Sequence, residues 1–204
     1  MRIIIPFKPV NPKSRLANIL NEFERENLAL LMLEDVIDVI RSCNFDPIVL
    51  STDYIPLKKF KIEINRSDLN TAINSEIKKD DCCIIMSDLP LISKEIFESF
   101  IQMDGDVIIA PGKRGGTNML LVRNKKFRVS YYGGSFFKHI EIAKKLGLNV
   151  KIFDSFFASI DIDTEEDLIE LLLHGKDKKS ARFLKKLGFF VEFKNGNALL
   201  RRVS

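Results

Sequence analysis

The sequence feature that most constrains the fold is a short apolar run that ends abruptly at an acidic residue. Cys82 to Met86 are five consecutive apolar residues, and Ser87, Asp88 and Pro90 follow them. Five residues are too few for an independent helix, but they fit a strand that is buried on both faces of a parallel sheet. Because proline cannot continue the hydrogen-bonded ladder, the strand must end before Pro90. Asp88 is therefore predicted to lie at the carboxyl end of a central strand, where open α/β sheets bind their ligands.

An ordinary structural role for Asp88 competes with this interpretation. Aspartate is common in turns and at helix N-termini, and a helix is predicted to begin soon afterwards, near Ser93. For an isolated residue of this kind the capping role is the more frequent one. The assignment of Asp88 to a binding site therefore depends on what the other predicted loops contain.

The pattern on both sides of this run predicts alternating strands and helices. Apolar runs of strand length occur at 2–7, 47–50, 82–86, 106–110, 119–122 and 150–153, with weaker candidates at 60–64 and 158–162. Apolar residues recur with helical spacing in the segments that begin near residues 21, 68, 93, 135 and 164. This order is typical of an α/β domain with a mostly parallel (mixed) central sheet and helices on both faces.

Composition excludes several other classes of protein. The chain has 204 residues, of which 46% are hydrophobic and 29% charged, as in a globular domain. No apolar run approaches the ~20 residues that span a bilayer, so we expect no membrane contact. The three cysteines show no metal-binding or redox spacing and read as core residues of a cytoplasmic protein, and two histidines are too few for a zinc site.

The positive charge of the chain is concentrated at its C-terminus. Residues 175–204 contain nine Lys and Arg residues against Asp177 and Glu192, whereas residues 1–174 are net negative. A basic tail can bind nucleic acid. Here apolar residues such as Phe183, Leu187 and Phe189 alternate with the charges, which favours packing on the main body or on a second subunit. We therefore divide the chain into a domain of residues 1–174 and a basic extension of residues 175–204 for packing or dimerisation.

The loop after the first predicted strand carries a group of cations. Lys8, Lys13 and Arg15 follow residues 2–7 closely, where positive charge can neutralise a polyphosphate. The loop contains neither G-x-x-x-x-G-K nor G-x-G-x-x-G, so the sequence does not predict a P-loop or a dinucleotide cofactor. The alternative is that these cations are ordinary solvated side chains.

Two glycine pairs are each followed by a hydroxyl residue. Gly115 and Gly116 precede Thr117, and Gly133 and Gly134 precede Ser135 at the predicted start of a helix. Glycines let backbone N–H groups approach an anion, and the first turn of a helix favours phosphate. The alternative is two ordinary turns, one of which ends in a serine N-cap.

A further acidic pair precedes the last helix of the predicted domain. Asp161 and Asp163 could join Asp88 in binding Mg²⁺, which prefers oxygen ligands from a few protein groups together with substrate phosphates. Because Mg²⁺ takes only a few ligands from protein groups, we expect only one of the pair to be a ligand. The other would cap the helix at Thr164 or face solvent. A cationic loop, two anion sites and separated carboxylates at strand ends are together what nucleotidyl transfer needs.

Several motifs resemble those of one known family, the 2-phospho-L-lactate guanylyltransferases of deazaflavin coenzyme (F-420) biosynthesis, archaeal members included. The resemblance covers about residues 1–173. The motifs that carry it are Ile5-Pro6-Phe7-Lys8-Pro9, Lys13-Ser14-Arg15-Leu16, Ser67-Asp68-Leu69-Asn70, Ser87-Asp88-Leu89-Pro90, Arg114-Gly115-Gly116-Thr117-Asn118, Tyr132-Gly133-Gly134-Ser135-Phe136 with His139, and Asp161-Ile162-Asp163-Thr164 with Glu166-Asp167-Leu168.

The resemblance implies a nucleotide-diphospho-sugar-transferase-like fold and a Mg²⁺-dependent transfer of GMP from GTP to 2-phospho-L-lactate. It implies that residues 1–174 form the nucleotidyltransferase domain. Residues 175–204 resemble the extension that some archaeal members carry, which makes them a candidate surface for a homodimer. The residue roles that the resemblance implies are the following: the triphosphate faces Lys8, Lys13 and Arg15, the base faces Asn70, the phospho-acid contacts Thr117, Gly134 and Ser135, and the metal is bridged by Asp88 and by Asp161 or Asp163.

Three positions depart from the family pattern. Met86 stands where related sequences can place an aspartate, Gly112 where an aspartate is common, and Glu165 where proline is usual. The number of metal ions therefore stays open. Two other functions also stay open: a nucleotidyltransferase with another NTP or another acceptor, such as phosphoenolpyruvate or a molybdopterin, and a non-catalytic RNA-binding protein that uses the basic tail.

Overall fold

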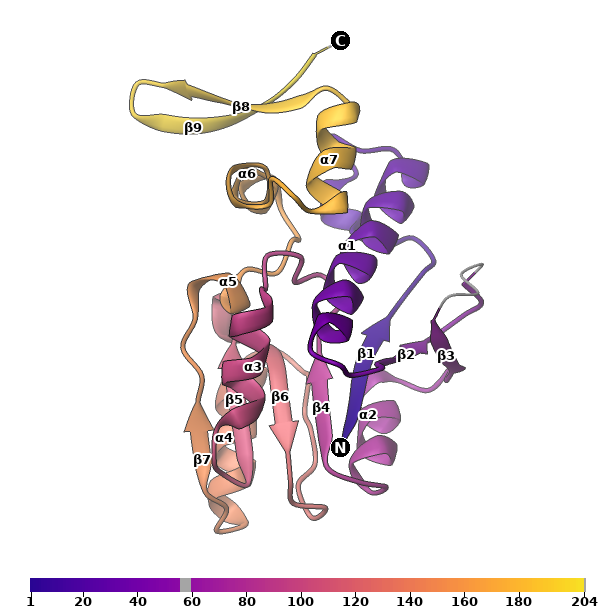
Figure 1. Cartoon of the computed structure of the whole chain (residues 1–204), viewed down its shortest axis with the longest axis vertical. Coiled ribbons are helices and arrows are strands. Elements are labelled where there is room, and N and C mark those ends of the chain that lie inside the picture. The colour runs from indigo at the N-terminus through magenta and orange to yellow at the C-terminus, as the bar shows by residue number, and fades with distance from the viewer. Residues whose placement is uncertain (56–59, 204) are drawn as a thin grey trace.

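The computed structural model describes residues 1–55 and 60–203, and its centre is a seven-stranded sheet in the order β3-β2-β1-β4-β6-β5-β7 (Figure 1). Its strands are β1 (Arg2–Phe7), β2 (Ile48–Ser51), β3 (Lys61–Ile64), β4 (Cys82–Ile85), β5 (Val107–Pro111), β6 (Thr117–Val122) and β7 (Val150–Ile152). All neighbouring strands are parallel except β6, which runs antiparallel to both β4 and β5. The mostly parallel, mixed sheet predicted from the sequence is confirmed, and β4 lies in the middle of it.

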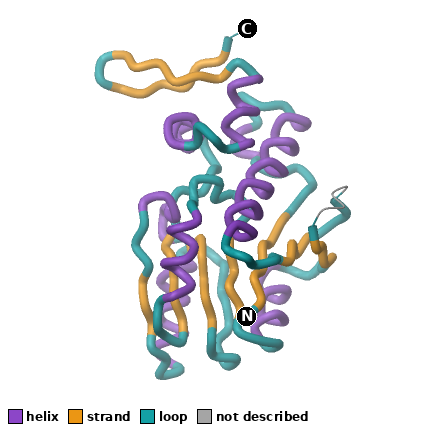
Figure 2. The backbone as a smooth tube through the Cα atoms, in the orientation of Figure 1, coloured by secondary structure: helices purple, strands orange, loops and turns teal. Residues whose placement is uncertain are grey.

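Helices cover both faces of the sheet, as Figure 2 shows by the purple segments on either side of the orange strands. One apolar core joins the sheet to α1, α3, α6 and α7, and a second core joins it to α2 and α4. The helices are α1 (Glu22–Ser42), α2 (Leu69–Ile77), α3 (Lys94–Gln102), α4 (Ser135–Lys145), α5 (Phe156–Ser159), α6 (Glu165–His174) and α7 (Lys179–Lys186), with two short 3₁₀ helices, η1 (Ser14–Leu16) and η2 (Lys113–Gly115).

Local sequence signals explain where the longest helix begins. Asn21 caps α1: its side chain accepts the N–H of Glu24 at 2.9 Å, and the Glu24 carboxylate accepts the N–H of Asn21 at 3.0 Å. This reciprocal arrangement satisfies two backbone donors that the first turn of a helix leaves free. The helix therefore starts at the residue that the sequence pattern indicates.

The weak strand candidate at 158–162 is wrong. A short helix, α5, occupies Phe156–Ser159 instead, and the Ser155 hydroxyl accepts the N–H of Ala158 at its start, at 3.5 Å. The chain then passes the ends of the strands, where the N–H of Ile162 donates to the Asp88 carbonyl at 3.1 Å. This one backbone bond brings the Asp161–Asp163 segment beside the loop that follows β4.

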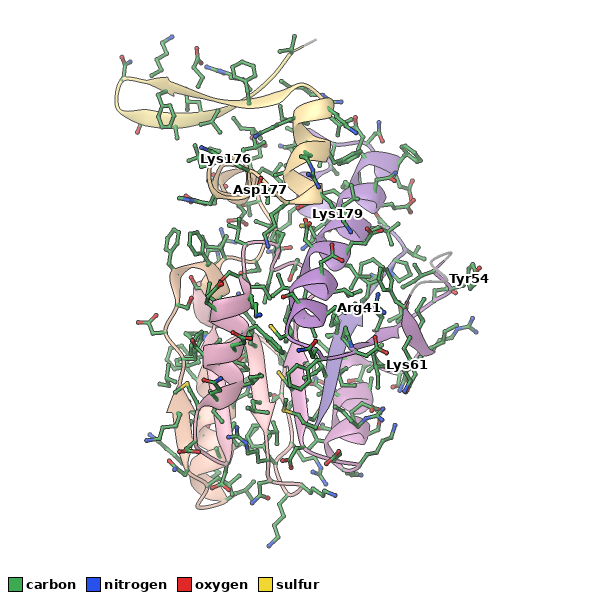
Figure 3. All side chains as sticks on the ribbon, in the orientation of Figure 1. Arg41, Tyr54, Lys61, Lys176, Asp177 and Lys179 are labelled. Atoms are coloured by element: carbon green, nitrogen blue, oxygen red, sulfur yellow. The ribbon has the colours of Figure 1, made fainter. Side chains whose placement is uncertain are left out.

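Residues 175–203 fold onto the body of the molecule. They form α7 and a hairpin of β8 (Phe189–Lys194) and β9 (Asn197–Arg202), and Ala181, Leu184 and Phe189 belong to the same core as α1. Several of the basic side chains form ion pairs. Lys179, which is labelled in Figure 3, contacts Glu34 and Asp38 of α1, each at 2.8 Å.

None of the helices in residues 1–55 and 60–203 is long and apolar enough to cross a membrane.

Candidate active site

The ammonium group of Lys13 lies between two carboxylates from distant parts of the sequence. Its Nζ donates to Asp88 Oδ2 at 2.6 Å and to Asp163 Oδ1 at 2.8 Å. Lys13 has a left-handed backbone (φ 52°) in the loop after β1, Asp88 follows β4, and Asp163 precedes α6. Figure 1 shows β1 and β4 ending on the side of the sheet that carries α6 and α7. The structure thus brings together the first cationic loop and two of the three predicted carboxylates at one sheet edge.

The charges in this cluster shift one another's ionisation. Burial lowers the pKa of Lys13, but the charges of Asp88 and Asp163 outweigh burial and hold its pKa above the ordinary value. Burial raises the pKa of Asp163, but the Lys13 ammonium and the Arg15 guanidinium hold it below the usual range. Both members of the Lys13–Asp163 pair are therefore charged at neutral pH.

Asp161 lies in a different electrostatic environment from Asp163. Burial and the nearby charge of Asp88, with a smaller effect from Asp163, raise the pKa of Asp161. Its Oδ1 accepts a long hydrogen bond from Asn118 Nδ2 at 3.4 Å, and the same amide donates to the Ala158 carbonyl at 3.0 Å. The two aspartates therefore face different partners, although alternate residues of a regular extended chain would point to the same face.

Gly112 makes room for the amide that supports Asp161. A Cβ atom at Gly112 would lie 2.6 Å from Asn118 Cγ, which is too close for two carbon atoms. Because Asn118 is buried, a larger residue at 112 would have to displace its side chain. Glycine therefore stands at position 112, where the family pattern commonly has aspartate, for a steric reason in this chain.

Two cavities meet at this cluster, and Asp163 lines both of them. The larger has a volume of about 530 Å³ and is lined by residues that include Lys8, Lys13 and Asp88, together with Asn65 and Ser67 from the loop before α2. The smaller has a volume of about 400 Å³. Molecules in the two cavities could therefore both reach the same carboxylate.

The walls of the smaller cavity carry more positive charge than the sequence pattern indicated. Arg15 lines it, donates to Asp163 Oδ2 at 3.1 Å and remains largely exposed. Lys113, Arg114 and Tyr132 also line it, and none of these three was singled out in the sequence as a site residue. The signal was present, because Arg114 and Tyr132 each lie beside one of the two glycine pairs.

Thr117, Gly134 and Ser135 come together on one side of the smaller cavity. Gly134 (φ 71°) precedes α4, so Ser135 is the first residue of that helix and not its cap. Gly134 and Ser135 line the cavity, and the Ser135 hydroxyl donates to Thr117 Oγ1 at 3.2 Å. Thr117 itself is buried behind Ser135 and accepts or donates at His139 Nδ1, 3.0 Å away.

Asn70 occupies a supporting position. Its side-chain Oδ1 accepts the N–H of Tyr131 at 2.6 Å, which ties the start of α2 to the chain segment before α4. Its neighbours Asp68 and Leu69 line the larger cavity, whereas Asn70 itself is not among the residues that line it. Any contact of Asn70 with a base stays a prediction.

The carboxylates fit a divalent cation that completes its coordination with phosphate. Asp88 Oδ2 and Asp163 Oδ1 both approach the single point that Lys13 Nζ occupies, so the ammonium stands where a cation is held. In the described part of the chain, no group of three or more His, Cys, Asp and Glu side chains could hold a metal ion. Mg²⁺ commonly takes only one or two carboxylates and fills the remaining positions with water and substrate phosphates.

Comparison with known proteins gives close relatives over the whole chain. The family model described as "Guanylyl transferase CofC like" matches residues 1–204. The 2-phospho-L-lactate guanylyltransferase of Archaeoglobus fulgidus is 52% identical over 203 residues, covering 100% of this chain and 98% of that protein. The protein of the same name from Ferroglobus placidus is 53% identical over 203 residues, covering 99% and 100%.

Solved structures share the fold at low sequence identity. A nucleotide-diphospho-sugar-transferase candidate from Desulfovibrio desulfuricans G20 has a TM-score of 0.75 at 16% identity, covering 91% of this chain and 95% of that chain. A nucleotidyl transferase from Methanothermobacter has a TM-score of 0.57 at 12% identity, covering 91% and 99%. With the whole-length match to the family model and relatives above 50% identity, this chain belongs to the CofC-like guanylyl transferase family.

Proposed function

We propose that this protein transfers GMP from GTP to 2-phospho-L-lactate, giving lactyl-2-diphospho-5′-guanosine and pyrophosphate. The observation that carries the proposal is the convergence of Asp88, Asp163 and Lys13 where the two cavities meet. Family membership and the names of the relatives support the choice of GTP and 2-phospho-L-lactate.

The bond changes need positioning and charge neutralisation more than proton transfer. A phosphate oxygen of 2-phospho-L-lactate forms a bond to the α-phosphorus of GTP, and the bond from that phosphorus to the bridging oxygen of the β-phosphate breaks. Pyrophosphate leaves with the bonding electron pair. Because the attacking phosphate is already ionised at neutral pH, no side chain has to act as a general base.

The larger cavity suits the nucleotide and the smaller one the acceptor. Lys8 and Lys13 line the larger cavity, where their charge would offset that of the triphosphate and of the departing pyrophosphate. Arg114 and Ser135 line the smaller cavity, where a guanidinium and a hydroxyl at a helix N-terminus suit the phosphate of the acceptor. Arg15 contacts Asp163 at the junction, so its charge is available to the reacting phosphates.

Asp88 and Asp163 would hold Mg²⁺ at the junction of the two cavities. The ion supplies electrostatic stabilisation of the charge that develops on the transferred phosphoryl group. If Asp88 and Asp163 hold the ion, they no longer need Lys13 as a partner, and the Lys13 ammonium is free to turn towards the triphosphate. Burial and the charge of Asp88 raise the pKa of Asp161, so a nearby cation would favour its ionised form.

Replacing Asp88 tests the proposal most directly. The variant Asp88→Asn should lower kcat at least about 100-fold, because one of two converging negative oxygens is lost, while the variant stays folded. Asp46→Asn, which changes an exposed aspartate paired with Arg41, is the matched control and should keep the wild-type rate.

The measurement is pyrophosphate release with each NTP and each phospho-acid in turn, at fixed Mg²⁺, with circular dichroism to check folding. Release with GTP and 2-phospho-L-lactate identifies the substrates, and release only with another pair, such as GTP and phosphoenolpyruvate, contradicts the acceptor. A near-normal rate of Asp88→Asn would show that the metal assignment is wrong.

A further inference from the structure

His139 is a buried titratable residue that the proposed chemistry does not use directly. Its side chain is fully buried on α4, and both ring nitrogens have hydrogen-bond partners. The aromatic rings of Phe127 and Tyr131 flank it, with centroids 5.9 and 5.1 Å from the imidazole. Because the ring is buried and both nitrogens are bonded, His139 can act on its surroundings through the direction of its hydrogen bonds.

The partner of one ring nitrogen fixes the tautomer. The backbone N–H of Ser130 donates to His139 Nε2 at 2.9 Å, and a backbone amide can only donate. Nε2 must therefore be unprotonated, so the proton of the neutral ring is on Nδ1. Burial lowers the pKa of His139 to about 4, and Tyr131, the titratable side chain packed against it, has a pKa raised by burial; both groups are therefore neutral at pH 7.

The protonated nitrogen makes Thr117 an acceptor. With its proton on Nδ1, His139 donates to Thr117 Oγ1 at 3.0 Å. Thr117 Oγ1 also contacts Ser135 Oγ at 3.2 Å, and Ser135 lines the smaller cavity. A hydroxyl group has one proton and two lone pairs. Because Thr117 accepts from His139 with a lone pair, its own proton remains available to be donated to Ser135 Oγ.

When an anion is bound, the result would be a one-way chain of donors that runs from His139 through Thr117 and Ser135 to the anion. In the structure, Ser135 donates its proton to Thr117. When an anion occupies the cavity, the Ser135 proton can turn to it, because Thr117 can replace that bond with its own proton while His139 fills the lone pair on Thr117. Without the donor at Nδ1, this exchange leaves a buried hydroxyl with an unmet hydrogen bond, which opposes anion binding.

We propose that His139 is a positioning residue that acts through Thr117 and Ser135 to present a hydroxyl donor to the phosphate of the acceptor. This inference rests on the proposed assignment of the smaller cavity to the acceptor. It adds to that assignment a residue that touches neither substrate and predicts an effect on one substrate alone.

Two substitutions of His139 separate the two ring nitrogens. The side-chain amide of His139→Asn takes the place of Nδ1 and can still donate to Thr117, whereas that of His139→Gln takes the place of Nε2 and can still accept from Ser130. Each variant keeps one of the two hydrogen bonds. Asparagine is one methylene group smaller than glutamine, so a purely packing role would make His139→Asn the more damaging change, which is the opposite of the order that the donor role predicts.

The kinetic test compares KM for 2-phospho-L-lactate with KM for GTP in the two variants. We expect His139→Gln to raise the acceptor KM about tenfold more than His139→Asn, with the KM for GTP similar in both, because only the first variant loses the donor to Thr117. His174→Gln, on the partly exposed last turn of α6, is the control and should leave both KM values as in the wild type. Equal acceptor KM values in the two His139 variants, or a parallel rise in the KM for GTP, would overturn the inference.

A second measurement does not depend on activity or on the folding of a variant. In ¹⁵N-labelled wild-type protein at pH 7, the ring nitrogens of His139 should show the neutral tautomer with the proton on Nδ1; a proton on Nε2 or a charged ring would refute the inference. If the wild type fails to turn over 2-phospho-L-lactate, the proposed function fails. If it turns over normally and the tautomer is the other one, the proposed function stands and the inference fails.

Discussion

Lys13 shows how a single side chain can be predicted as a cation and still acquire its role from distant residues. The loop composition indicated a phosphate-binding cation, and the structure places its ammonium 2.6 and 2.8 Å from two carboxylates. The side chain is only 10% exposed, so these contacts are screened weakly by solvent. Before any cation binds, Lys13 offsets the repulsion between Asp88 and Asp163.

Removing the Lys13 ammonium should increase the thermal stabilisation that Mg²⁺ gives the protein. In Lys13→Met the two carboxylates face each other without a cation, so Mg²⁺ should bind more tightly and stabilise the variant by about 1 kcal/mol more than the wild type, which is about 2–4 °C in Tm. Thermal melts with and without Mg²⁺, in the absence of nucleotide, measure this difference.

Lys8→Met is the matched control for this experiment. Lys8 also lines the larger cavity and is exposed, but the structure records no ion pair between it and these carboxylates. Its response to Mg²⁺ should equal that of the wild type. An equal Mg²⁺ shift for Lys13→Met and the wild type would place the cation elsewhere.

At the scale of secondary-structure elements, the start of α7 depends on a residue of α1. Asp35 accepts the N–H of Lys179 at 2.8 Å, the N–H of Ser180 at 3.0 Å and the Ser180 hydroxyl at 2.6 Å. Lys178, at the N-cap position, makes no side-chain capping bond. A carboxylate 144 positions away therefore performs the capping that the local sequence does not supply.

Substitution of Asp35 should destabilise the protein more than substitution of Asp38, its exposed neighbour on α1. Asp35 is 4% exposed, so Asp35→Ala should lower the free energy of unfolding by about 1–3 kcal/mol, because buried N–H and O–H groups lose their acceptor. Asp38→Ala removes an ion pair with Lys179 from a side chain that is 55% exposed and should cost about 0–1 kcal/mol. Urea denaturation of both variants measures the difference, and equal losses would contradict the capping role.

The β8–β9 hairpin and the helix α5 were not predicted from the sequence, and only the hairpin has a clear local sequence signal. The hairpin of β8 and β9 turns at Asn195 and Gly196, both with positive φ, and Asn-Gly is a strong hairpin signal that is present in the sequence. The helix α5 had no comparable signal, because the alternation of apolar residues at 158–162 fits a strand equally well. There the tertiary contact of Ile162 with the Asp88 carbonyl decided the path of the chain.

At the scale of the whole molecule, the hairpin bears on the expected homodimer. It packs one face on α6 and α7, and it leaves Phe193 70% and Phe190 44% exposed at one end of the molecule (Figure 1). Exposed aromatic residues are enriched in subunit interfaces. The homodimer stays a prediction, and these exposed aromatic residues allow it to be tested.

Sedimentation equilibrium should show a dimer for the wild type, and Phe193→Ser should weaken it about tenfold or more in Kd, since a truncated aromatic anchor is costly at the centre of an interface. Tyr54→Ser changes an equally exposed aromatic residue distant from the hairpin and is the control. A wild type that is monomeric at all concentrations would contradict the expectation, and an unchanged Kd in Phe193→Ser would place the interface elsewhere.

The sequence by itself determined the fold class, the central position of β4, the capped start of α1 and the kinds of side chain that gather at the sheet edge. These follow from hydrophobic periodicity and local capping, which act over a few residues. Only the tertiary structure decided that Lys13 lies between Asp88 and Asp163, that Arg114 and Tyr132 line the smaller cavity, and that His139 bonds Thr117. Such contacts join residues that are far apart in the chain, and their geometry is set by how strands and loops pack, which no local pattern encodes.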